Sequence, residues 1–434
     1  MDDLSEMVAK LNSGEVRARL KTLYGDRDGM CDRQVKRYES LLRRFSDSFP
    51  GQKAGMIVTA PGRTEIGGNH TDHNRGRVLA AAVNLDTAAA VAPRADMTVN
   101  LHSEGYPAIR LDLNELAIHE EEMGTTAALI RGVAAGMKKS GYRIGGFDAT
   151  VTSSVASGSG LSSSAAFEVM ICAILDRLYN DFRIPFAEKA KISQYAENAY
   201  FGKPCGLLDQ MASAAGGLVT VDFGPDEPEI KAMNFDFAAN GYALVVVATG
   251  GSHADLTDCY AAIPAEMKAV AAKLGGKVLR DIPETDFTAN AGKLRAELGE
   301  RPVMRAFHFY RENERVTRQV NALEKNDLRA FLDEITDSGR SSFMYLQNVY
   351  PHPEEQGLSL ALCIAEGILK EDGAWRVHGG GFAGTTLNFV PQGKLGAFRK
   401  AMENAFGEGC CQVLDIRPEG AAVIELLTEG DGEI

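Results

Sequence analysis

The sequence predicts an α/β protein with more than one domain. The chain has 434 residues, and at about 150 residues per domain this length favours two or three domains. Hydrophobic residues make up 45% and charged residues 24%, a balance typical of globular proteins that excludes collagen, coiled-coil arrays and disordered chains. Segments with strand character also alternate with segments of helical period along the chain. Together these observations indicate mixed α/β domains, each large enough to bury a core.

Residues 1–50 alternate apolar and charged side chains and predict a helical segment ahead of the first domain. A β-like run follows at residues 56–60, and we expect it to end at Pro61, because proline cannot continue a strand ladder. A crowded polar loop comes next. Apolar, β-branched runs at 78–83 and 88–91 then predict strands, so the loop should be held by a sheet on both sides.

A strand–loop–helix unit is predicted in the middle of the chain. Residues 147–152 alternate like a strand and lead into a Ser/Gly loop at 157–160. After that loop the apolar period changes to 3.6, and the positions expected to face the core are Phe167, Met170, Ile171, Ile174, Leu175 and Leu178. Glu168, Asp176 and Arg177 lie opposite them and are expected to face solvent. The run at 241–247 predicts a strand opening a second domain, followed by helices near 264–274 and 312–336.

The charge balance limits the classes of partner. The chain has 46 basic and 59 acidic residues, a formal net charge of −13, and a pI near 5.2. Such a chain lacks the basic surface that non-specific binding to nucleic acid or to an anionic membrane requires. Seven scattered cysteines without CxxC spacing predict reduced thiols. An acidic amino terminus and no apolar run of about 18 residues favour a cytoplasmic protein.

A Ser/Gly-rich stretch at residues 155–166 is the most informative motif. Gly158 and Gly160 allow the backbone to turn its N–H groups toward a ligand, and serines 162–164 begin a helix whose amino end favours anions. This composition predicts a phosphate-binding loop. On composition alone, a Ser/Gly turn with a serine N-cap is equally favoured. The residues fit neither a P-loop nor a Rossmann fingerprint, in which the third glycine would replace Ser163.

A polar segment at residues 61–76 predicts a small-molecule site. Its side chains combine hydrogen-bond donors and acceptors between apolar strands, as binding of several sugar hydroxyls requires; they are Arg63, Glu65, Asn69, His70 and Asp72. A solvated loop would also be polar. Metal ligation by His70, Asp72 and His73 is a less favoured alternative.

A single acid stands out in the third stretch, residues 196–211. Asp209 lies among glycine and apolar residues, and a buried acid is rarely left unpaired. It could cap a helix. If instead it lies beside a cation such as Arg63, it stays ionised and can orient a hydroxyl nucleophile. The fourth stretch, residues 377–386, is a glycine-rich turn ahead of a strand, which by itself might be only a tight bend.

These four stretches, in this order over residues 56–390, resemble the galactokinase branch of the GHMP small-molecule kinase superfamily. The resemblance implies a two-domain α/β (α+β) fold, with a ribosomal protein S5 domain 2-like N-terminal domain and a ferredoxin-like C-terminal domain. We assign the helical extension to 1–50, the N-terminal domain to 51–230 and the C-terminal domain to 231–434. The site should lie between the two domains.

The resemblance also implies roles for individual residues. Asp209 falls at the position of the catalytic aspartate and Arg63 at that of its arginine partner. Magnesium would be held by Ser164 and Glu197. Positions that bind ATP are Gly158, Ser159, Gly160, Leu161, Ser162, Ser163 and Ser164. Positions that contact the sugar are Glu65, Asn69, His70, Asp72, Gly206 and Tyr260. The partners implied are a small sugar and ATP, and a monomer is favoured.

The sequence departs from the family pattern in the sugar segment. Galactokinases usually have Asn where this chain has Glu65, and Glu where it has Asn69, so the two residue types are exchanged. If both border one pocket, an amide that can donate and accept replaces an acceptor-only carboxylate. The expected activity is phosphorylation of the anomeric hydroxyl of galactose. The alternatives are another sugar, such as an arabinose, a uronic acid or a modified galactose, or a non-catalytic sensor of sugar and ATP.

Overall fold

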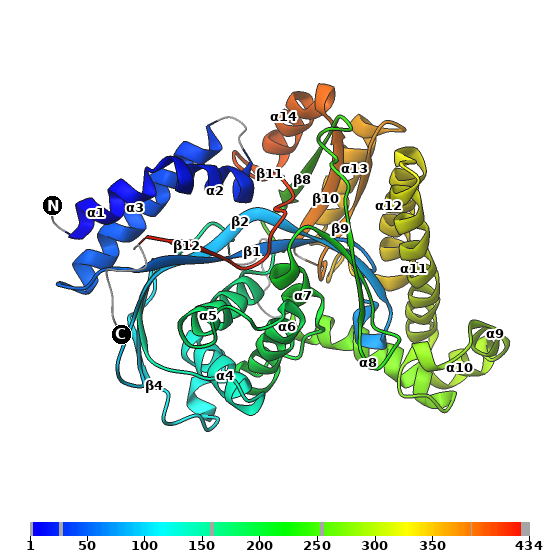
Figure 1. Cartoon of the computed structure of the whole chain (residues 1–434). Coiled ribbons are helices and arrows are strands. Elements are labelled where there is room, and N and C mark those ends of the chain that lie inside the picture. The colour runs from blue at the N-terminus through cyan, green and yellow to red at the C-terminus, as the bar shows by residue number, and fades with distance from the viewer. Residues whose placement is uncertain (1–2, 26–28, 157–159, 252–255, 383, 427–434) are drawn as a thin grey trace.

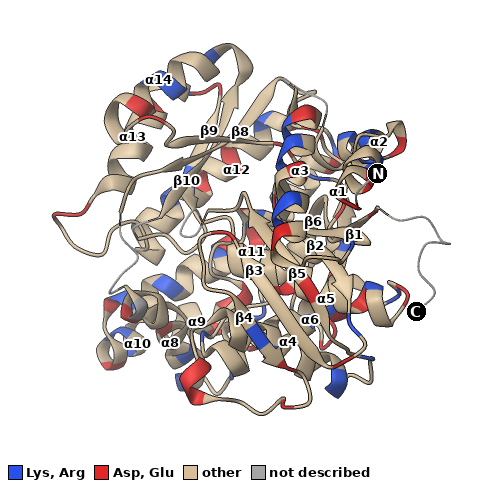
Figure 2. Cartoon of the chain, turned by 90° about the vertical axis from the view of Figure 1, so that its left-hand side faces the viewer, with Lys and Arg blue, Asp and Glu red and all other residues tan. Residues whose placement is uncertain are grey.

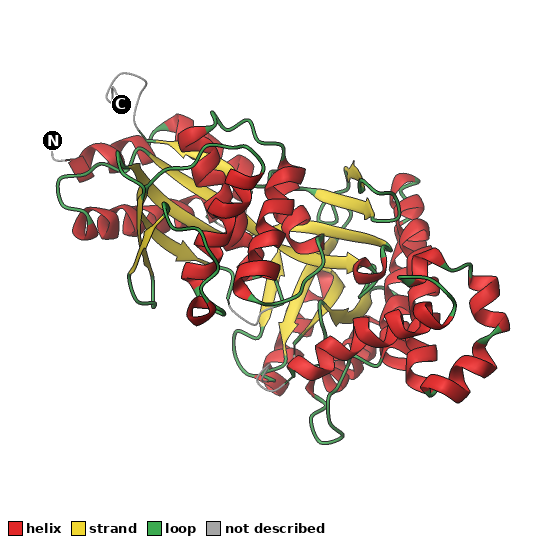
Figure 3. Ribbon diagram, turned by 90° about the horizontal axis from the view of Figure 1, so that it is seen from below, coloured by secondary structure: helices red, strands yellow, loops and turns green. Residues whose placement is uncertain are grey.

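The computed structural model describes residues 3–25, 29–156, 160–251, 256–382 and 384–426. Two sheets lie side by side, each flanked by helices, as Figure 3 shows from below. In the view of Figure 2, Lys and Arg positions and Asp and Glu positions are interspersed along the helices. Among the helices of these segments, none is long and apolar enough to cross a bilayer.

The first sheet has eight strands. Its main path runs in the spatial order β12 (Ala422–Glu425), β1 (Met56–Gly67), β2 (Arg77–Pro93), β5 (Phe147–Ser153), β3 (Thr98–Ser103) and β4 (Ile109–Asp112). A branch adds β6 (Leu218–Asp222), which pairs with β2, and β7 (Glu229–Met233). The β3–β5 pair is parallel, whereas the other pairs are antiparallel.

Helices cover both faces of this sheet (Figure 1). One face carries α4 (Thr126–Lys139), α5 (Ser163–Tyr179), α6 (Phe186–Tyr195) and α7 (Leu208–Ala215). The other carries the helical extension, which consists of α1 (Asp3–Leu11), α2 (Gly14–Tyr24) and α3 (Met30–Ser48). Each face has its own apolar core. Because both faces are covered, β1 is buried throughout and its side chains need not alternate between apolar and polar.

The second sheet is antiparallel and has four strands. Its spatial order is β11 (Cys411–Leu414), β8 (Tyr242–Ala248), β10 (Thr385–Pro391) and β9 (Ala374–His378). The chain passes from β8 through helices to β9 and β10, then through α14 (Leu395–Phe406) to β11. This is the β-α-β-β-α-β succession of ferredoxin-like folds, as predicted.

Within the residues that the structure describes, seven α-helices belong to the region of the second sheet. Between β8 and β9 come α8 (Thr257–Lys273), α9 (Glu284–Ala289), α10 (Ala291–Leu298), α11 (Glu300–Glu324), α12 (Leu328–Ser341) and α13 (Gly357–Leu369). α13 and α14 share a core with one face of the sheet. α11 and α12 pack on the other face, and their core continues into β1 and β2, so this core joins the two sheets.

Several expectations from the sequence are wrong. The first strand does not end at Pro61: β1 continues to Gly67 because a register shift between Pro61 and Arg63 accommodates the missing N–H. Arg63 and Glu65 therefore lie on a strand and not in a loop. The helix expected over 312–336 is two helices, separated at a turn where Asn326 has a φ of 54°.

The solvent face expected for α5 is also wrong. Glu168 and Asp176 are fully buried, because α5 is the central helix of its layer and contacts α4, α6 and α7. The charge of Asp176 is matched from α6, where Lys189 Nζ lies 2.7 Å from its carboxylate. A helical period identifies the apolar face, but not a polar residue whose partner comes from another helix.

The predicted domain limits fall close to, but not at, the ends of elements. The limit at 230/231 lies inside β7. The last described strand, β12, returns from the second domain and pairs with β1 in the first sheet. Residues 422–425 therefore do not belong to the second sheet, although they were expected in the C-terminal domain.

Candidate active site

Asp209 and Arg63 meet although 146 positions separate them in the sequence. Arg63 projects from β1 and Asp209 lies in the first turn of α7. Arg63 Nε donates to Asp209 Oδ1 at 2.6 Å, and Nη2 donates to Oδ2 at 2.8 Å. Such two-point pairing fixes both position and orientation. The Asp209 side chain is still 31% exposed, so the carboxylate keeps an edge open to a ligand.

The surroundings of Asp209 keep it ionised. Burial favours the neutral acid, but the Arg63 guanidinium and the Ser162 hydroxyl outweigh this effect and lower the pKa of Asp209. Ser162 Oγ donates to Oδ2 at 2.6 Å. The Asp209 carboxylate is therefore available at neutral pH as an acceptor for a hydroxyl proton.

The predicted phosphate loop reaches this ion pair through its second half. Gly158 and Ser159 lie outside the described residues. The carbonyl of Gly160 accepts a hydrogen bond from Arg63 Nη1, and that of Leu161 accepts one from the Arg63 N–H at 2.9 Å. Helix α5 then begins at Ser163, and the first N–H groups of a helix have no partner within it. The amino end of α5 thus offers donors to an anion beside Asp209.

A second acidic group lies next to the start of α5. Ser164 Oγ donates to Glu197 Oε1 at 3.0 Å, and Glu197 lies in a π-helical segment, residues 196–201, after α6. Lys203 Nζ is 2.9 Å from the same oxygen. The structure therefore brings together the two residues expected on the magnesium side, and a lysine that the sequence analysis did not single out balances the charge of Glu197.

Two carboxyl groups share one amide behind this position. Gln210 Nε2 donates to Glu197 Oε2 at 2.7 Å and to Glu168 Oε2 at 3.1 Å. Burial and the charge of Glu197 raise the pKa of Glu168 well above its usual range. Glu168 therefore favours its protonated form. The sequence analysis missed Gln210, although it follows Asp209 directly.

Asn69 is enclosed within the protein. Its amide donates to Glu65 Oε1 at 2.9 Å and to the carbonyl of Gly379 at 2.6 Å. Its oxygen accepts from Ser342 Oγ at 3.2 Å and from Asn348 Nδ2 at 2.9 Å. An amide has two donors and two lone pairs, so neighbouring residues use all four positions. The side chain is also fully buried.

Glu65 forms a second buried ion pair. Arg376 on β9 donates from Nη2 to Glu65 Oε1 at 2.6 Å and from Nη1 to the carbonyl of Ile66. The Arg376 side chain is fully buried and that of Glu65 is 6% exposed. Glu65 and Asn69 are therefore in contact with each other. The hydrogen bonds described here for both side chains are to other groups of the protein.

Two other residues predicted to contact the sugar are His70 and Tyr260. His70 Nε2 donates to the carbonyl of Gly380 at 3.1 Å, and burial lowers the pKa of His70 to about 3, so its ring is neutral. Tyr260 Oη donates to the carbonyl of Gly381 at 3.0 Å. Both residues therefore contact the glycine-rich turn of the fourth motif.

Asp72 lies against Gly206 in the loop that leads to Asp209. A Cβ added at Gly206 would lie 1.7 Å from Asp72 Oδ2, so a side chain at this position would require the Asp72 carboxylate to move. Asp72 Oδ1 accepts from the N–H of His73 at 2.9 Å. The contact brings the sugar segment next to the loop that positions the Asp209–Arg63 pair.

His378 is another residue that the sequence analysis missed. It is buried at the end of β9, and its Nε2 accepts from the Glu65 N–H at 3.2 Å and from Thr64 Oγ1 at 3.1 Å. Its Nδ1 donates to Thr385 Oγ1 at 3.0 Å. Through these hydrogen bonds, His378 connects β1 with the second sheet beside Arg63. A histidine directly before three glycines was the available signal.

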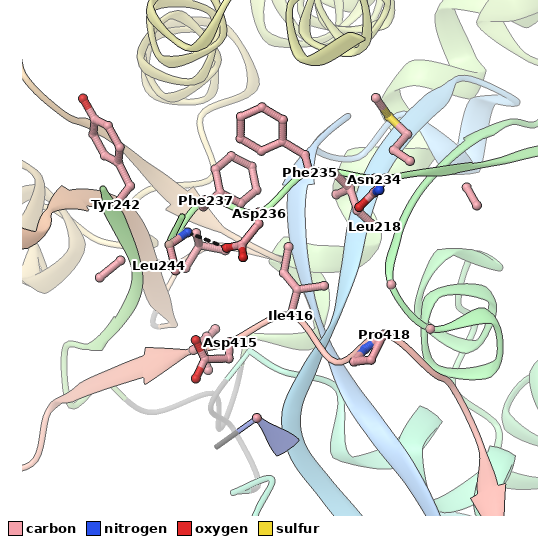
Figure 4. A pocket seen from close by; sticks show the side chains of 18 of the residues that line it. Leu218, Asn234, Phe235, Asp236, Phe237, Tyr242, Leu244, Asp415, Ile416 and Pro418 are labelled. Atoms are coloured by element: carbon pink, nitrogen blue, oxygen red, sulfur yellow. Dashed lines mark hydrogen bonds between the residues drawn. The ribbon is translucent and has the colours of Figure 1, made fainter. Parts of the chain in front are cut away.

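The cavity drawn in Figure 4 lies elsewhere in the fold. It has a volume of about 600 Å³ and lies between the end of α2, the segment 234–238 and the segment 415–418 (Figure 4). None of the residues above lines it. The candidate site is therefore assigned from the geometry of its side chains and not from the size of a cavity.

Two protein families match the segments that contain these residues. The family described as "Galactokinase galactose-binding signature" matches residues 43–93, and "GHMP kinases N terminal domain" matches residues 128–217. The first range contains Arg63 to Asp72. The second contains the described end of the phosphate loop, Glu197 and Asp209.

Relatives cover most of the chain. A protein of Streptomyces coelicolor named galactokinase is 34% identical over 368 residues, which are 84% of this chain and 91% of that protein. The crystal structure of Lactococcus lactis galactokinase complexed with galactose has a TM-score of 0.77 and 25% identity, covering 89% of this chain and 99% of that one. The mevalonate kinase of Methanococcus jannaschii shares the fold, with a TM-score of 0.58, 14% identity and coverage of 86% and 98%.

Proposed function

This chain belongs to the galactokinase family of the GHMP kinases, and on that premise we propose that it transfers the terminal phosphoryl group of ATP to the anomeric hydroxyl of galactose. The observation that carries the proposal is the pair Asp209–Arg63, with the Asp209 carboxylate partly open and the amino end of α5 beside it. An acceptor for a hydroxyl proton and a set of anion-binding amides are the two parts that such a transfer needs.

In this proposal, Asp209 orients the sugar hydroxyl by accepting its hydrogen bond. Because Arg63 and Ser162 lower the pKa of Asp209, the carboxylate is a weak base toward an unreacted hydroxyl. The proton can pass to Asp209 only as the bond to phosphorus forms and the hydroxyl becomes more acidic. Positioning and electrostatic stabilisation, rather than strong basicity, then supply most of the rate enhancement.

Magnesium fits the oxygen donors at the start of α5. Ser164 and Glu197 supply a hydroxyl and a carboxylate 3.0 Å apart, and Mg²⁺ is usually held by one or two protein groups together with waters and substrate phosphates. Within the described ranges no group of three or more Asp, Glu, His or Cys residues could hold a metal by itself, which is compatible with such a shared site. When bound, magnesium would neutralise charge on the phosphates.

The second candidate function is phosphorylation of a different sugar. It is favoured by the closed environment of Asn69, whose four hydrogen-bonding positions are all used within the protein. A sugar group opposite Asn69 would find no free partner on that side chain. Sugars that differ there would then be accepted as well as galactose, or better.

The test is a coupled assay of ADP release over a panel of sugars. Galactose, an arabinose, a uronic acid and a modified galactose are compared at equal concentration with a reaction lacking sugar, and products are identified by ³¹P NMR. We expect ADP release with galactose and a sugar 1-phosphate product. Preference for another member of the panel would establish the second candidate. Binding of sugar and ATP without ADP release would refute both and indicate a sensor.

A further inference from the structure

A buried cluster centred on Asp86 connects the helical extension with the first sheet. Asp86 lies on β2 and is fully buried. Its carboxylate accepts hydrogen bonds from the hydroxyls of Tyr24 on α2 and Thr59 on β1. It also accepts from Arg37 on α3 and, at 2.9 Å, from Arg417 Nη1. Four donors from separate parts of the chain thus meet at one acid.

The cluster holds the Asp86 carboxylate and the Arg417 guanidinium away from water, and the Arg37 side chain is 17% exposed. Burial would raise the pKa of Asp86, but Arg37 and Arg417 outweigh it and lower the pKa, so the acid is ionised. A buried ion pair is a weak source of stability, because its desolvation cost is large and an apolar group of similar volume often stabilises as well. Its distinctive property is geometry, since each donor fixes the direction of the group that it contacts.

The same cluster fixes the end of β5, where the chain enters the phosphate loop. The Asp86 N–H donates to Ser154 Oγ at 2.9 Å, and the Asp86 carbonyl accepts from the Ser154 N–H at 2.9 Å. Arg37 Nη2 donates both to the Asp86 carbonyl, at 3.1 Å, and to the Thr152 carbonyl, at 3.3 Å. The Arg37 guanidinium therefore spans β2 and β5 immediately before the loop.

Arg417 extends the cluster toward the helix that carries Asp209. Its Nη2 donates to the carbonyl of Gly420 at 3.0 Å, and its own carbonyl accepts from the N–H of Gly217 at 2.8 Å. A Cβ at Gly420 would lie 2.1 Å from the carbonyl oxygen of Ala214. The segment 417–420 thus packs closely on the carboxyl end of α7.

We propose that Tyr24 and Arg37 are positioning residues, through which the helical extension holds the entry to the phosphate loop in the geometry that ATP binding requires. The inference rests on the proposed function, because it takes the stretch at 155–164 to bind ATP. Figure 1 shows α2 and α3 on the face of the sheet opposite α5 and α7. The extension therefore acts through the sheet and does not contact the nucleotide.

The test separates geometry from stability with Arg37→Lys. Lysine keeps the charge beside Asp86, but it cannot reproduce the two bonds that Nη2 makes to the carbonyls of Asp86 and Thr152. At about a factor of five per lost hydrogen bond, we expect the KM for ATP to rise roughly 5–25-fold while kcat changes less than about twofold. Tyr24→Phe removes one hydroxyl, and we expect it to raise the KM for ATP by about fivefold.

The matched control is Leu20→Ala. Leu20 is fully buried in the same helical layer and forms no bond to the Asp86 cluster. It should lower thermal stability at least as much as Arg37→Lys and leave the KM for ATP unchanged. The proposal is overturned if Arg37→Lys binds ATP like the parent protein, or if Leu20→Ala weakens ATP binding as much as Arg37→Lys does.

Hydrogen exchange keeps this test independent of the proposed activity. The rate of backbone amide exchange is measured in the full chain, with and without ATP, for the peptide that covers residues 147–156. The parent protein, Arg37→Lys and Leu20→Ala are compared. We expect faster exchange in Arg37→Lys and not in Leu20→Ala, whether or not a sugar is phosphorylated. Faster exchange with no ATP binding in the parent protein would refute the proposed function alone. Unchanged exchange would refute the positioning role.

Discussion

Two carboxylate–guanidinium pairs lie on β1 two residues apart, yet only one is open to a ligand. Arg63 pairs with Asp209, whose side chain is 31% exposed. Glu65 pairs with Arg376, and these side chains are 6% and 0% exposed. Asn69 and the carbonyl of Ile66 occupy the remaining positions around the second pair. The residue types are similar, so the open edge, and not the ion pair itself, distinguishes a site for chemistry from a structural contact.

The two pairs also differ in how burial acts on the acid. Burial favours the neutral form of both carboxyl groups. At Asp209, Arg63 and Ser162 prevail and the pKa falls. At Glu65, burial prevails over Arg376 and Arg63, and the pKa rises. The acid proposed for chemistry is therefore the one whose charge is better supported, which suits a group that must accept a proton from a bound hydroxyl.

The largest expected effect comes from Asp209→Ala. Removing the acceptor should reduce kcat by roughly 10³-fold, because positioned acid–base groups contribute about 10²–10⁴-fold. ATP binding, measured by calorimetry, should change little, since Asp209 is proposed to contact the sugar hydroxyl. The matched control is Asp337→Ala, which removes an exposed acid 3.0 Å from Arg340 and should leave kcat unchanged. A kcat close to that of the parent protein would exclude Asp209 from the mechanism.

Glu65→Asn tests the buried pair Glu65–Arg376, which we call the closed pair; the open pair is Arg63–Asp209. This substitution leaves Arg376 buried without a counter-charge, and breaking a buried pair in this way costs about 3–5 kcal/mol. We expect the free energy of unfolding, measured with urea, to fall by this amount. Asp209→Asn should cost much less, because Asp209 is partly exposed, so the Arg63–Asp209 pair is less completely removed from water. Equal losses would mean that the two pairs do not differ as described.

The double exchange Glu65→Asn with Asn69→Glu sharpens this prediction. Asn69→Glu alone places a second acid against Glu65 in a buried region, so it should also be strongly destabilising. The double exchange restores one acid and one amide in contact, and we expect it to recover part of the lost stability. Strict additivity of the two single losses would show that the exchanged residues do not act as a pair.

The sequence predicted the open pair better than the closed one. The Gly-rich apolar context of Asp209 indicated that this acid could lie beside a cation such as Arg63, and the resemblance to galactokinases assigned the two residues as a pair. Arg376 had no such signal: it lies in the β-like run Ala374–His378, and its partner is 311 positions away. Nothing local showed that Asn69 would be enclosed, since its contacts come from β1, from Ser342 and Asn348 after α12, and from the glycine-rich turn.

The wrong predictions about the fold also arise from contacts between segments that are distant in the sequence. The pattern of α5 identified its apolar positions, but Glu168 is buried because Gln210 of α7 contacts it. Pro61 was expected to end a strand, and the register shift that lets β1 continue depends on the pairing of β1 with β2. Local patterns therefore predicted the type of most elements, whereas burial of charged residues and continuation through proline depend on contacts between elements.

The smallest effect is expected for Ser162→Ala, which changes the open pair without breaking it. Ser162 Oγ donates to Asp209 Oδ2 at 2.6 Å, and Arg63 still donates to both carboxylate oxygens when that hydroxyl is removed. One hydrogen bond to a charged group is worth about 1.5–3 kcal/mol at most, and Arg63 compensates part of it, so we expect kcat to fall about tenfold or less. Because the hydroxyl favours the ionised acid, its loss raises the pKa of Asp209.

The dependence of kcat/KM on pH in Ser162→Ala shows whether the pKa of Asp209 rises as expected. Activity requires ionised Asp209 and is lost as the pH falls through its pKa, so a raised pKa moves the acid limb of kcat/KM to higher pH. In the parent protein, the lowered pKa of Asp209 keeps this limb below the pH range in which an ordinary aspartate titrates. An acid limb that stays in place would mean that Ser162 does not support the charge of Asp209.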